Sequence, residues 1–173
     1  EVTVFEAAAR VGGHANTVSV VEGSRTFAVD TGFIVYNPQT YPNLTALFYH
    51  LDVPTRPSDM SLSISLDGAA LEYSGTGFRG VFAQGKNLIS PRFWTMLRDI
   101  KRFYRQAPCD VLHLDATRTT LGDYLSARNY GRAFQDDHLL PMAAAIWSAP
   151  ARTLLEYPAA AFINFYHNHG LLT

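Results

Sequence analysis

The residues whose types and spacing suggest chemistry lie in the first seventeen positions, EVTVFEAAARVGGHANT. A short apolar run over residues 2–5 ends at Glu6, and a double glycine, Gly12-Gly13, follows shortly after. The run is typical of a buried parallel strand. An acid at the tip of such a strand can hydrogen-bond ribose hydroxyls, and glycines let a backbone approach a pyrophosphate closely. The stretch therefore indicates the second half of a nucleotide-binding unit, and the alternative is an ordinary strand followed by a glycine loop.

The first half of such a unit has a signature of its own. A glycine-rich turn, GxGxxG, belongs roughly twenty residues before the acid, and only five residues precede Glu6. We therefore expect the first strand and its turn to lie before Glu1, in a longer protein. We also expect self-association through the sheet edge that the missing strand leaves exposed.

Later stretches extend the pattern and carry a family resemblance. FEAAARVGGHANTV, FAVDTGFIVYN and YPNLTALFYHLDVPT resemble the N-terminal FAD-binding segment of the flavin amine oxidase superfamily. That segment has an acid after the second strand, R-x-G-G-R, a strand ending D-x-G, and a helix leading to "eLG(l/v)". Here these parts are Glu6, RVGGH at 10–14, DTG at 30–32 and HLDV at 50–53. The whole sequence also resembles a bacterial subgroup of predicted NAD/FAD-binding amine-oxidase-like proteins, through stretches such as PSDMS, ISPRFW, AAAIWSAP and FYHNHGLL.

The resemblance implies an FAD-dependent oxidoreductase that transfers a hydride from an amine, or from an unsaturated or lipid-like substrate, to the flavin. It implies that Glu6 binds the adenosine ribose, that the glycine pair lies along the pyrophosphate, and that residues 31–34 approach the flavin ring. His14 stands where most amine oxidases carry Arg, and Ala8 where several relatives carry a basic residue. The cofactor-binding residues so implied are Glu6, Arg10, Gly12, Gly13, His14, Thr31, Gly32, Phe33 and Ile34.

The resemblance further implies that the full-length protein continues past Thr173, so that this chain is an internal fragment. We expect the fragment by itself to be inactive and to bind FAD weakly or not at all.

The composition is that of a globular protein, with 47% hydrophobic and 17% charged residues. The net charge of −1 gives no reason to expect nucleic acid as a partner. The single cysteine, Cys109, excludes an internal disulfide and suits a reducing compartment, so we expect a cytoplasmic location. No apolar run approaches the ~18 residues needed to span a bilayer.

The pattern along the chain predicts an α/β protein with two domains. Residues 1–56 are expected to form a partial FAD/NAD(P)-binding Rossmann-like domain, which lacks the first strand and the GxGxxG turn. Residues 57–173 are expected to form a largely helical α+β substrate domain that contains a β-hairpin. In the first domain we predict strands over 17–21 and 27–29, a turn between them, and a helix over 41–51 with Thr40 as its N-cap.

The second domain is expected to open with a hairpin. Residues 60–66 alternate apolar side chains with serines, Asp67-Gly68 is a strong turn signal, and residues 69–73 return. The serine face suits either the floor of a substrate pocket or a solvated surface. Residues 75–87 are expected to form a loop, because no helix start follows Gly75-Thr76-Gly77 closely enough to cradle a phosphate.

Ser90-Pro91 predicts a helix start, with Ser as N-cap and Pro at the first helical position. This helix has an apolar face and an opposite basic face of Arg98, Lys101, Arg102 and Arg105. The basic face is either solvated or a contact for an anionic membrane surface or acidic partner. Further helices are predicted over 119–130, ended by Gly131, over 132–147, kinked or broken by Pro141, and over 156–166, interrupted by Pro158, with Cys109 in a loop.

Candidate substrate-pocket residues are Tyr36, Trp147, Phe165 and Tyr166, joined by His167 and His169. The two histidines lack a third ligand of metal-binding type nearby, so no metal site is predicted. His138 and Ser148 cannot be paired as base and nucleophile from their spacing, and no GxSxG motif is present. A small-molecule substrate is the expected partner. The alternative to an enzyme is a non-catalytic module of the same fold that binds a nucleotide or associates peripherally with a membrane surface.

Overall fold

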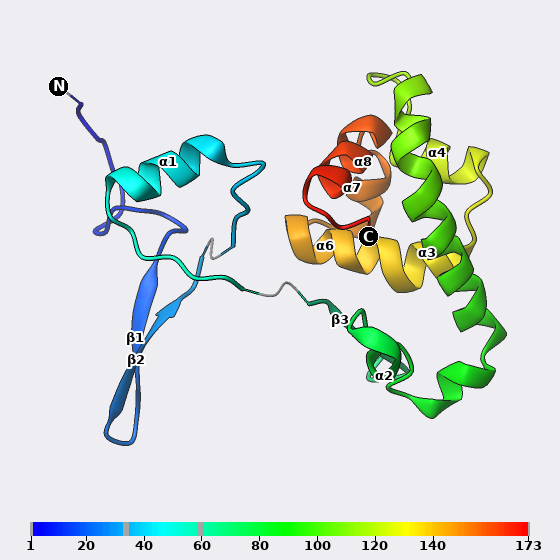
Figure 1. The fold of residues 1–173 in the computed structure, drawn as a ribbon, viewed down its shortest axis with the longest axis horizontal. Helices are drawn as coiled ribbons and strands as arrows, with labels where there is room; N and C mark the ends of the chain where they lie inside the picture. The colour runs from blue at the N-terminus through cyan, green and yellow to red at the C-terminus, as the bar shows by residue number, and fades with distance from the viewer. Residues whose placement is uncertain (1, 33–34, 59–60, 173) are drawn as a thin grey trace. The chain divides into compact units, whose positions relative to one another are not determined.

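The structure, a computed structural model, describes residues 2–32, 35–58 and 61–172. The chain divides into two compact units, Glu1–Ser58 and Asp59–Thr173, called unit 1 and unit 2 below. Figure 1 shows β1, β2 and α1 in unit 1 and the remaining elements in unit 2. Among the described residues, no helix is long and apolar enough to cross a membrane.

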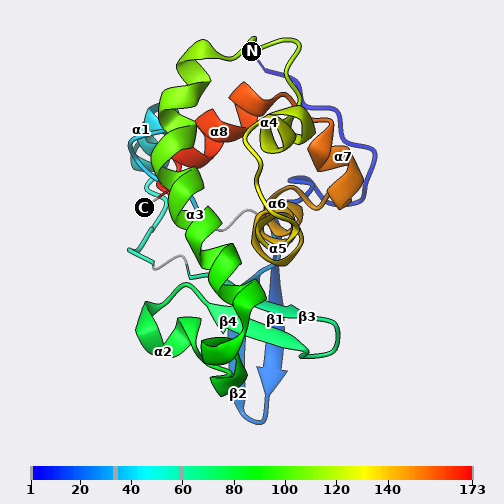
Figure 2. The ribbon, with the colours of Figure 1, turned by 90° about the vertical axis from the view of Figure 1, so that its right-hand side faces the viewer.

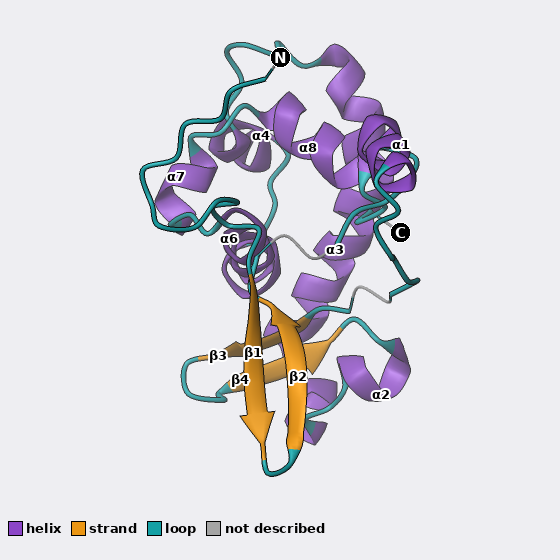
Figure 3. Ribbon diagram, turned by 90° about the vertical axis from the view of Figure 1, so that its left-hand side faces the viewer, coloured by secondary structure: helices purple, strands orange, loops and turns teal. Residues whose placement is uncertain are grey.

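Unit 1 contains one antiparallel hairpin and one helix. Strand β1 (Thr17–Glu22) pairs with β2 (Arg25–Asp30), so that Glu22 lies opposite Arg25 across a two-residue turn (Figure 3). Gly23 in the turn has φ = +61°, the left-handed region that such turns favour. The predicted pair of strands is confirmed.

Helix α1 (Pro42–His50) begins after Tyr41, so the prediction that Thr40 caps it is wrong. The Thr40 hydroxyl instead donates to Oδ1 of Asn37 at 2.6 Å. The helix starts later because Pro42 is favoured at the first helical position.

The prediction of a buried strand over residues 2–6 is also wrong. These residues belong to no strand or helix, and the side chains of Val2 and Phe5 are 90% and 93% exposed. A strand needs a neighbour for its ladder of hydrogen bonds, and the described strands β1 and β2 pair only with each other. Together the two units combine helices with two small antiparallel sheets, in agreement with the predicted mixed α/β class.

Unit 2 opens with the predicted hairpin, in which β3 (Ser63–Leu66) pairs with β4 (Leu71–Ser74). Ile64 and Tyr73 are buried from one face of the hairpin. Ser63 and Ser65 are exposed on the other, which supports the solvated alternative.

Residues 75–87 are not a plain loop as expected. They contain helix α2 (Gly77–Val81), and a 3-10 turn, Gly85–Ile89, follows it.

Helix α3 (Pro91–Asp110) is the long helix against which the rest of unit 2 is built (Figure 2). Its predicted N-cap is confirmed, since Ser90 Oγ accepts the N–H of Phe93 at 3.3 Å. The predicted apolar face is confirmed as well, with Phe93, Met96 and Phe103 buried. The helix extends through Pro108, so Cys109 is helical and exposed, and its expected placement in a loop is wrong.

Short helices complete unit 2 behind α3. They are α4 (Leu121–Ala127), α5 (Arg132–Phe134), a π-helical turn (Gln135–Leu139), α6 (Leu140–Trp147), α7 (Ala151–Leu155) and α8 (Ala159–Asn168). Their apolar faces form the core, whose fully buried members include Leu121, Leu125, Phe134, Leu139, Phe162 and Ile163.

Two predicted helix ends differ from the observed ones. Helix α4 ends at Ala127, because Asn129 takes the left-handed conformation (φ = +53°). Gly131, the predicted stop, is the N-cap of α5 instead. Pro158 does interrupt the last predicted helix, since it precedes α8, while α7 lies before it.

Candidate functional site

The glycine loop of unit 1 is held together by Arg10. Its guanidinium donates to the carbonyl oxygens of Val11 (3.1 Å), Gly13 (2.7 Å) and Ala15 (3.1 Å). The loop closes on itself through the Ala15 N–H, which donates to the Gly12 carbonyl at 2.9 Å. One cation thus gathers three carbonyl dipoles. Arg10 therefore shapes the loop from within.

Both glycines of this loop are required by its geometry. Gly12 has φ = +108°, and a Cβ there would lie 2.8 Å from the Ala15 oxygen. Gly13 has φ = +55°, and nothing lies within 4 Å of its missing Cβ. No atom therefore covers the backbone at Gly13, and a bulky ligand could approach it closely.

The DTG turn lies directly against this loop. The Thr31 N–H donates to the Asn16 carbonyl at 2.8 Å, and the Asn16 side-chain amide donates to the Thr31 hydroxyl at 3.0 Å. A Cβ on Gly32 would lie 1.6 Å from the His14 oxygen, so only glycine fits this approach. The β1–β2 register brings the two motifs together by placing Thr17 opposite Asp30, and the Thr17 hydroxyl donates to that carboxylate at 2.6 Å.

The remaining cofactor candidates are less constrained. The Glu6 carboxylate accepts the Ala8 N–H at 2.8 Å and is exposed. His14 is exposed as well. Phe33 and Ile34 lie outside the described residues. The structure thus unites the candidates of residues 10–14 with those of residues 31–32, while the ribose-binding role of Glu6 stays a prediction.

A second glycine pattern went unrecognised in the sequence. Residues 75–80 read GTGFRG, which matches GxGxxG, and they follow β4 and open α2. A Cβ on Gly80 would lie 2.2 Å from Ser74 Oγ, so this glycine permits close packing of helix on strand. The surroundings differ from a dinucleotide site, because β4 belongs to an antiparallel hairpin and α2 spans only five residues. Here Gly77, with φ = +64°, suits a tight turn, and Gly80 serves the packing of helix on strand.

Three of the four candidate pocket residues lie together in unit 2. The Trp147 ring stands 4.6 Å from that of Phe165 and 6.0 Å from that of Tyr166. Tyr166 is fully buried. Tyr36 lies in unit 1, where its ring meets Phe48 edge-on at 5.2 Å. The substrate-pocket role of all four stays a prediction.

A buried histidine that spacing alone could not assign lies between two tyrosines. His138 Nδ1 is 2.9 Å from the Tyr73 hydroxyl, and its Nε2 is 3.2 Å from the Tyr104 hydroxyl. Tyr73 gives its proton to the Asp137 carbonyl at 2.9 Å. His138 Nδ1–H must then donate to Tyr73, and Tyr104 must donate to Nε2. Burial lowers the pKa of His138 to about 4, so the ring is neutral in this chain of hydrogen bonds.

Pro141 explains why the Asp137 carbonyl has no α-helical hydrogen-bond donor. Pro141 has no N–H to return to the carbonyl four residues earlier. The helix over 132–147 therefore departs from α geometry just before Pro141, as predicted, and Tyr73 satisfies the orphan oxygen.

A cavity of about 440 Å³ lies beside this turn, between the β3–β4 hairpin and the start of α3. Arg92 and Asp137 line it and form a bidentate ion pair at 2.7 and 2.9 Å. The Asp137 carboxylate raises the pKa of Arg92. Lys86 also lines the cavity and donates to the Ala70 carbonyl.

Within residues 2–32, 35–58 and 61–172, no group of three or more His, Cys, Asp or Glu side chains could hold a metal ion.

The flavin containing amine oxidoreductase family matches residues 1–136, which include the glycine loop, the DTG turn and α3. This chain belongs to that family. Membership indicates a flavin-dependent oxidoreductase of the amine oxidase type. No curated protein matched the chain.

Proposed function

We propose that this chain is part of an enzyme that binds FAD and transfers a hydride to it from an amine or from an unsaturated or lipid-like substrate. In this proposal unit 1 belongs to a Rossmann-like FAD-binding domain, and unit 2 belongs to the substrate domain. The observation that carries it is the contact between the RVGGH loop and the DTG turn at Gly32. The two motifs lie sixteen or more residues apart in the sequence and meet where Gly32, against the His14 carbonyl, tolerates no side chain.

The residues of unit 1 fit a dinucleotide. The bare backbone at Gly13 suits the approach of a pyrophosphate, and the exposed Glu6 carboxylate can accept hydrogen bonds from ribose hydroxyls. Arg10 holds three of the loop carbonyls, and loop amides are proposed to bind the phosphates. Thr31 and Gly32 would place the following backbone against the ring system. FAD, when bound, supplies the hydride acceptor.

The substrate side is proposed to use the aromatic residues of unit 2. Trp147 and Phe165 are half-buried and offer flat apolar surface, which suits an aliphatic or unsaturated substrate.

The direct test is a titration of the full-length apoprotein with FAD, followed by flavin absorbance and fluorescence. Glu6→Gln is expected to weaken FAD binding about tenfold or more, because hydrogen bonds to a charged acceptor contribute about 1.5–3 kcal/mol. Glu22→Gln, which changes an exposed acid in the hairpin, is the matched control and should bind as the wild type does.

Anaerobic mixing of the loaded enzyme with a panel of amines and unsaturated lipids would identify the substrate class by bleaching of the flavin. A folded full-length protein that takes up no FAD would refute the proposal.

A further inference from the structure

A row of cations runs along the exposed side of α3. Arg98, Lys101 and Arg105 follow one another at spacings of three and four, so their side chains lie on one side of the helix. A groove of about 480 Å³ lies along this row, and its lining consists of Arg98, Lys101, Arg102, Arg105 and Gln106. Four of these five side chains are cationic and none is acidic.

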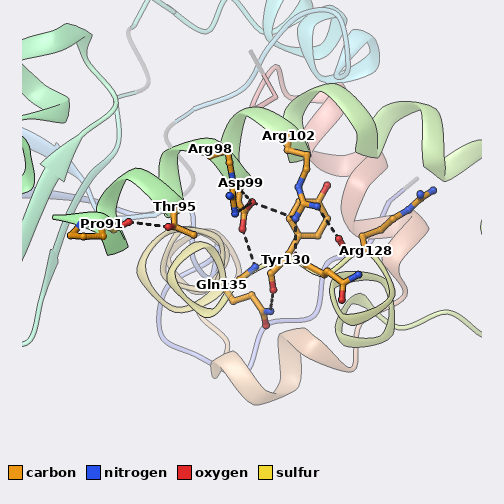
Figure 4. A network of polar contacts seen from close by, with 10 residues as sticks. Pro91, Thr95, Arg98, Asp99, Arg102, Arg128, Tyr130 and Gln135 are labelled. Carbon is orange, nitrogen blue, oxygen red and sulfur yellow. Dashed lines mark hydrogen bonds and ion pairs between the residues drawn. The ribbon is translucent and has the colours of Figure 1, made fainter. Parts of the chain in front are cut away.

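Part of this charge is already neutralised and part is free. Asp99 is fully buried beneath the row and pairs with Arg98 and Arg102 at 3.4 Å each (Figure 4). Arg102 also lies over the Tyr130 ring, 4.1 Å from its centroid, and donates to two backbone carbonyls. In the described part of the chain, Lys101 and Arg105 make no ion pair. The outer end of the row therefore carries uncompensated positive charge.

An exposed apolar patch adjoins the start of the same row. Phe78 is 73% exposed, Ile89 84% and Trp94 50%. Phe82 joins two of them, since its ring lies 4.7 Å from Phe78 and 5.5 Å from Trp94. Trp94 precedes Arg98 by four residues, so the patch continues into the cationic row.

The Trp94 ring is prepared for an apolar environment. Its indole N–H donates to the Leu88 carbonyl at 2.8 Å, so its polar atom already has a partner within the protein. Burial of the ring in lipid therefore leaves no hydrogen-bond donor without a partner. We call the patch (Phe78, Leu88, Ile89, Trp94) and the row (Arg98, Lys101, Arg105) together the α3 surface.

We propose that the α3 surface docks on an anionic phospholipid bilayer. The apolar patch enters the interface between headgroups and acyl chains, and the cations of the row bind lipid phosphates. Exposed aromatic and aliphatic side chains beside Lys and Arg are the composition of interfacial membrane contacts. An acidic protein partner would account for the exposed cations but not for the exposed apolar patch beside them. This inference is independent of flavin binding.

The test is co-sedimentation of the full-length protein with vesicles, at about 0.1 M salt, where the Debye length is about 10 Å. One set of vesicles is phosphatidylcholine alone, and the other also contains phosphatidylserine. The protein is expected to sediment with the second set. Lys101→Glu/Arg105→Glu should lower the partition coefficient at least about twenty-five-fold, since each cation near an anionic surface contributes about fivefold. Arg118→Glu/Arg152→Glu, at exposed arginines elsewhere in unit 2, is the matched control and should lose much less.

The apolar patch has its own variant. Phe78→Ser/Ile89→Ser should lower partitioning more than Ile146→Ser/Tyr157→Ser, which changes exposed apolar residues in α6 and after α7. Circular dichroism of every variant establishes that it is folded.

Three results would overturn the proposal. The folded wild type could fail to sediment with either vesicle type, or the charge-reversal variant could bind as well as its control. Alternatively, polyglutamate could displace the protein completely while the Phe78→Ser/Ile89→Ser variant binds normally, which would identify an acidic protein as the partner.

Discussion

The two units use different means to fix their structures. No described residue of unit 1 is buried, and its glycine loop, DTG turn and hairpin are set by hydrogen bonds and glycine conformations. Unit 2 has two clusters of buried apolar residues and also buries polar groups such as Asp99 and His138. The motifs that resemble a flavin site thus lie in the unit without a core. Because local openings cost least where few apolar groups are buried, we expect unit 1 to open more readily than unit 2.

The largest predicted effect is the loss of a phenylalanine ring in unit 2, compared with the same loss in unit 1. Phe162→Ala removes a fully buried ring that lies 5.3 Å from Trp147, and it should lower the free energy of unfolding of unit 2 by about 3–5 kcal/mol. Phe27→Ala in β2, where the ring is 42% exposed, should cost less than about 1 kcal/mol. Urea unfolding followed by tryptophan fluorescence measures the loss in unit 2, because both tryptophans, Trp94 and Trp147, lie there, and hydrogen exchange at the β1–β2 amides measures the loss in unit 1. If Phe27→Ala shifted the tryptophan transition as far as Phe162→Ala does, the two units would not be independent.

The second prediction concerns pH and unit 2. Burial lowers the pKa of His138 to about 4 in the folded state, below the ordinary value of 6.5. The unfolded chain therefore binds more protons between these values, and unit 2 should lose up to about 3 kcal/mol as the pH falls from 6.5 to 4. Stability from this group is fully present above pH 6.5. Repeating the urea titrations across this range measures the slope.

His138→Gln should flatten that slope, because glutamine does not titrate. His14→Gln, at an exposed histidine of unit 1, is its control and should leave the slope unchanged. An unaltered slope in His138→Gln would assign the pH dependence to another group.

The third prediction tests the contact between the two motifs of unit 1. Gly32→Ala places a Cβ 1.6 Å from the His14 oxygen, so the DTG turn must separate from the loop. We expect a local cost of about 1–3 kcal/mol and faster hydrogen exchange at the Thr31 amide. Gly13→Ala meets no atom, and only its positive φ should cost about 1 kcal/mol. Equal exchange at Thr31 in both variants would argue against the contact.

The smallest effect compares two threonines expected near helix starts. Thr120 caps α4, and its hydroxyl and the Asp123 carboxylate form a reciprocal capping box. Thr120→Ala should therefore destabilise unit 2 by about 1 kcal/mol. Thr40→Ala in unit 1 should cost only a few tenths, because the Thr40 N–H still bonds to Asn37 without the hydroxyl. Amide exchange in α1 and α4 measures both, and a larger loss in α1 would reverse the comparison.

The sequence was sufficient where structure depends on neighbouring residues. Ser90-Pro91, the Asp67-Gly68 hairpin and the turn at Gly23 were all predictable, because caps and tight turns depend on a few adjacent residues. The GxGxxG spacing of residues 75–80 is also visible in the sequence, although it is absent from the predictions made above. By contrast, the strand predicted over residues 2–6 failed, since its pattern specified burial that requires a partner strand.

For the candidate site, too, some features were predictable from the sequence and others depended on the tertiary structure. The residue types of the RVGGH loop and the DTG turn identified the family from the sequence, because glycine and acid spacings are themselves the signal. That Gly32 abuts His14, that Arg10 organises the loop, and that His138 links Tyr73 to Tyr104 were decided only by tertiary structure. Residues 73 and 138 are sixty-five positions apart, and no local pattern encodes which distant polar groups will share a buried space.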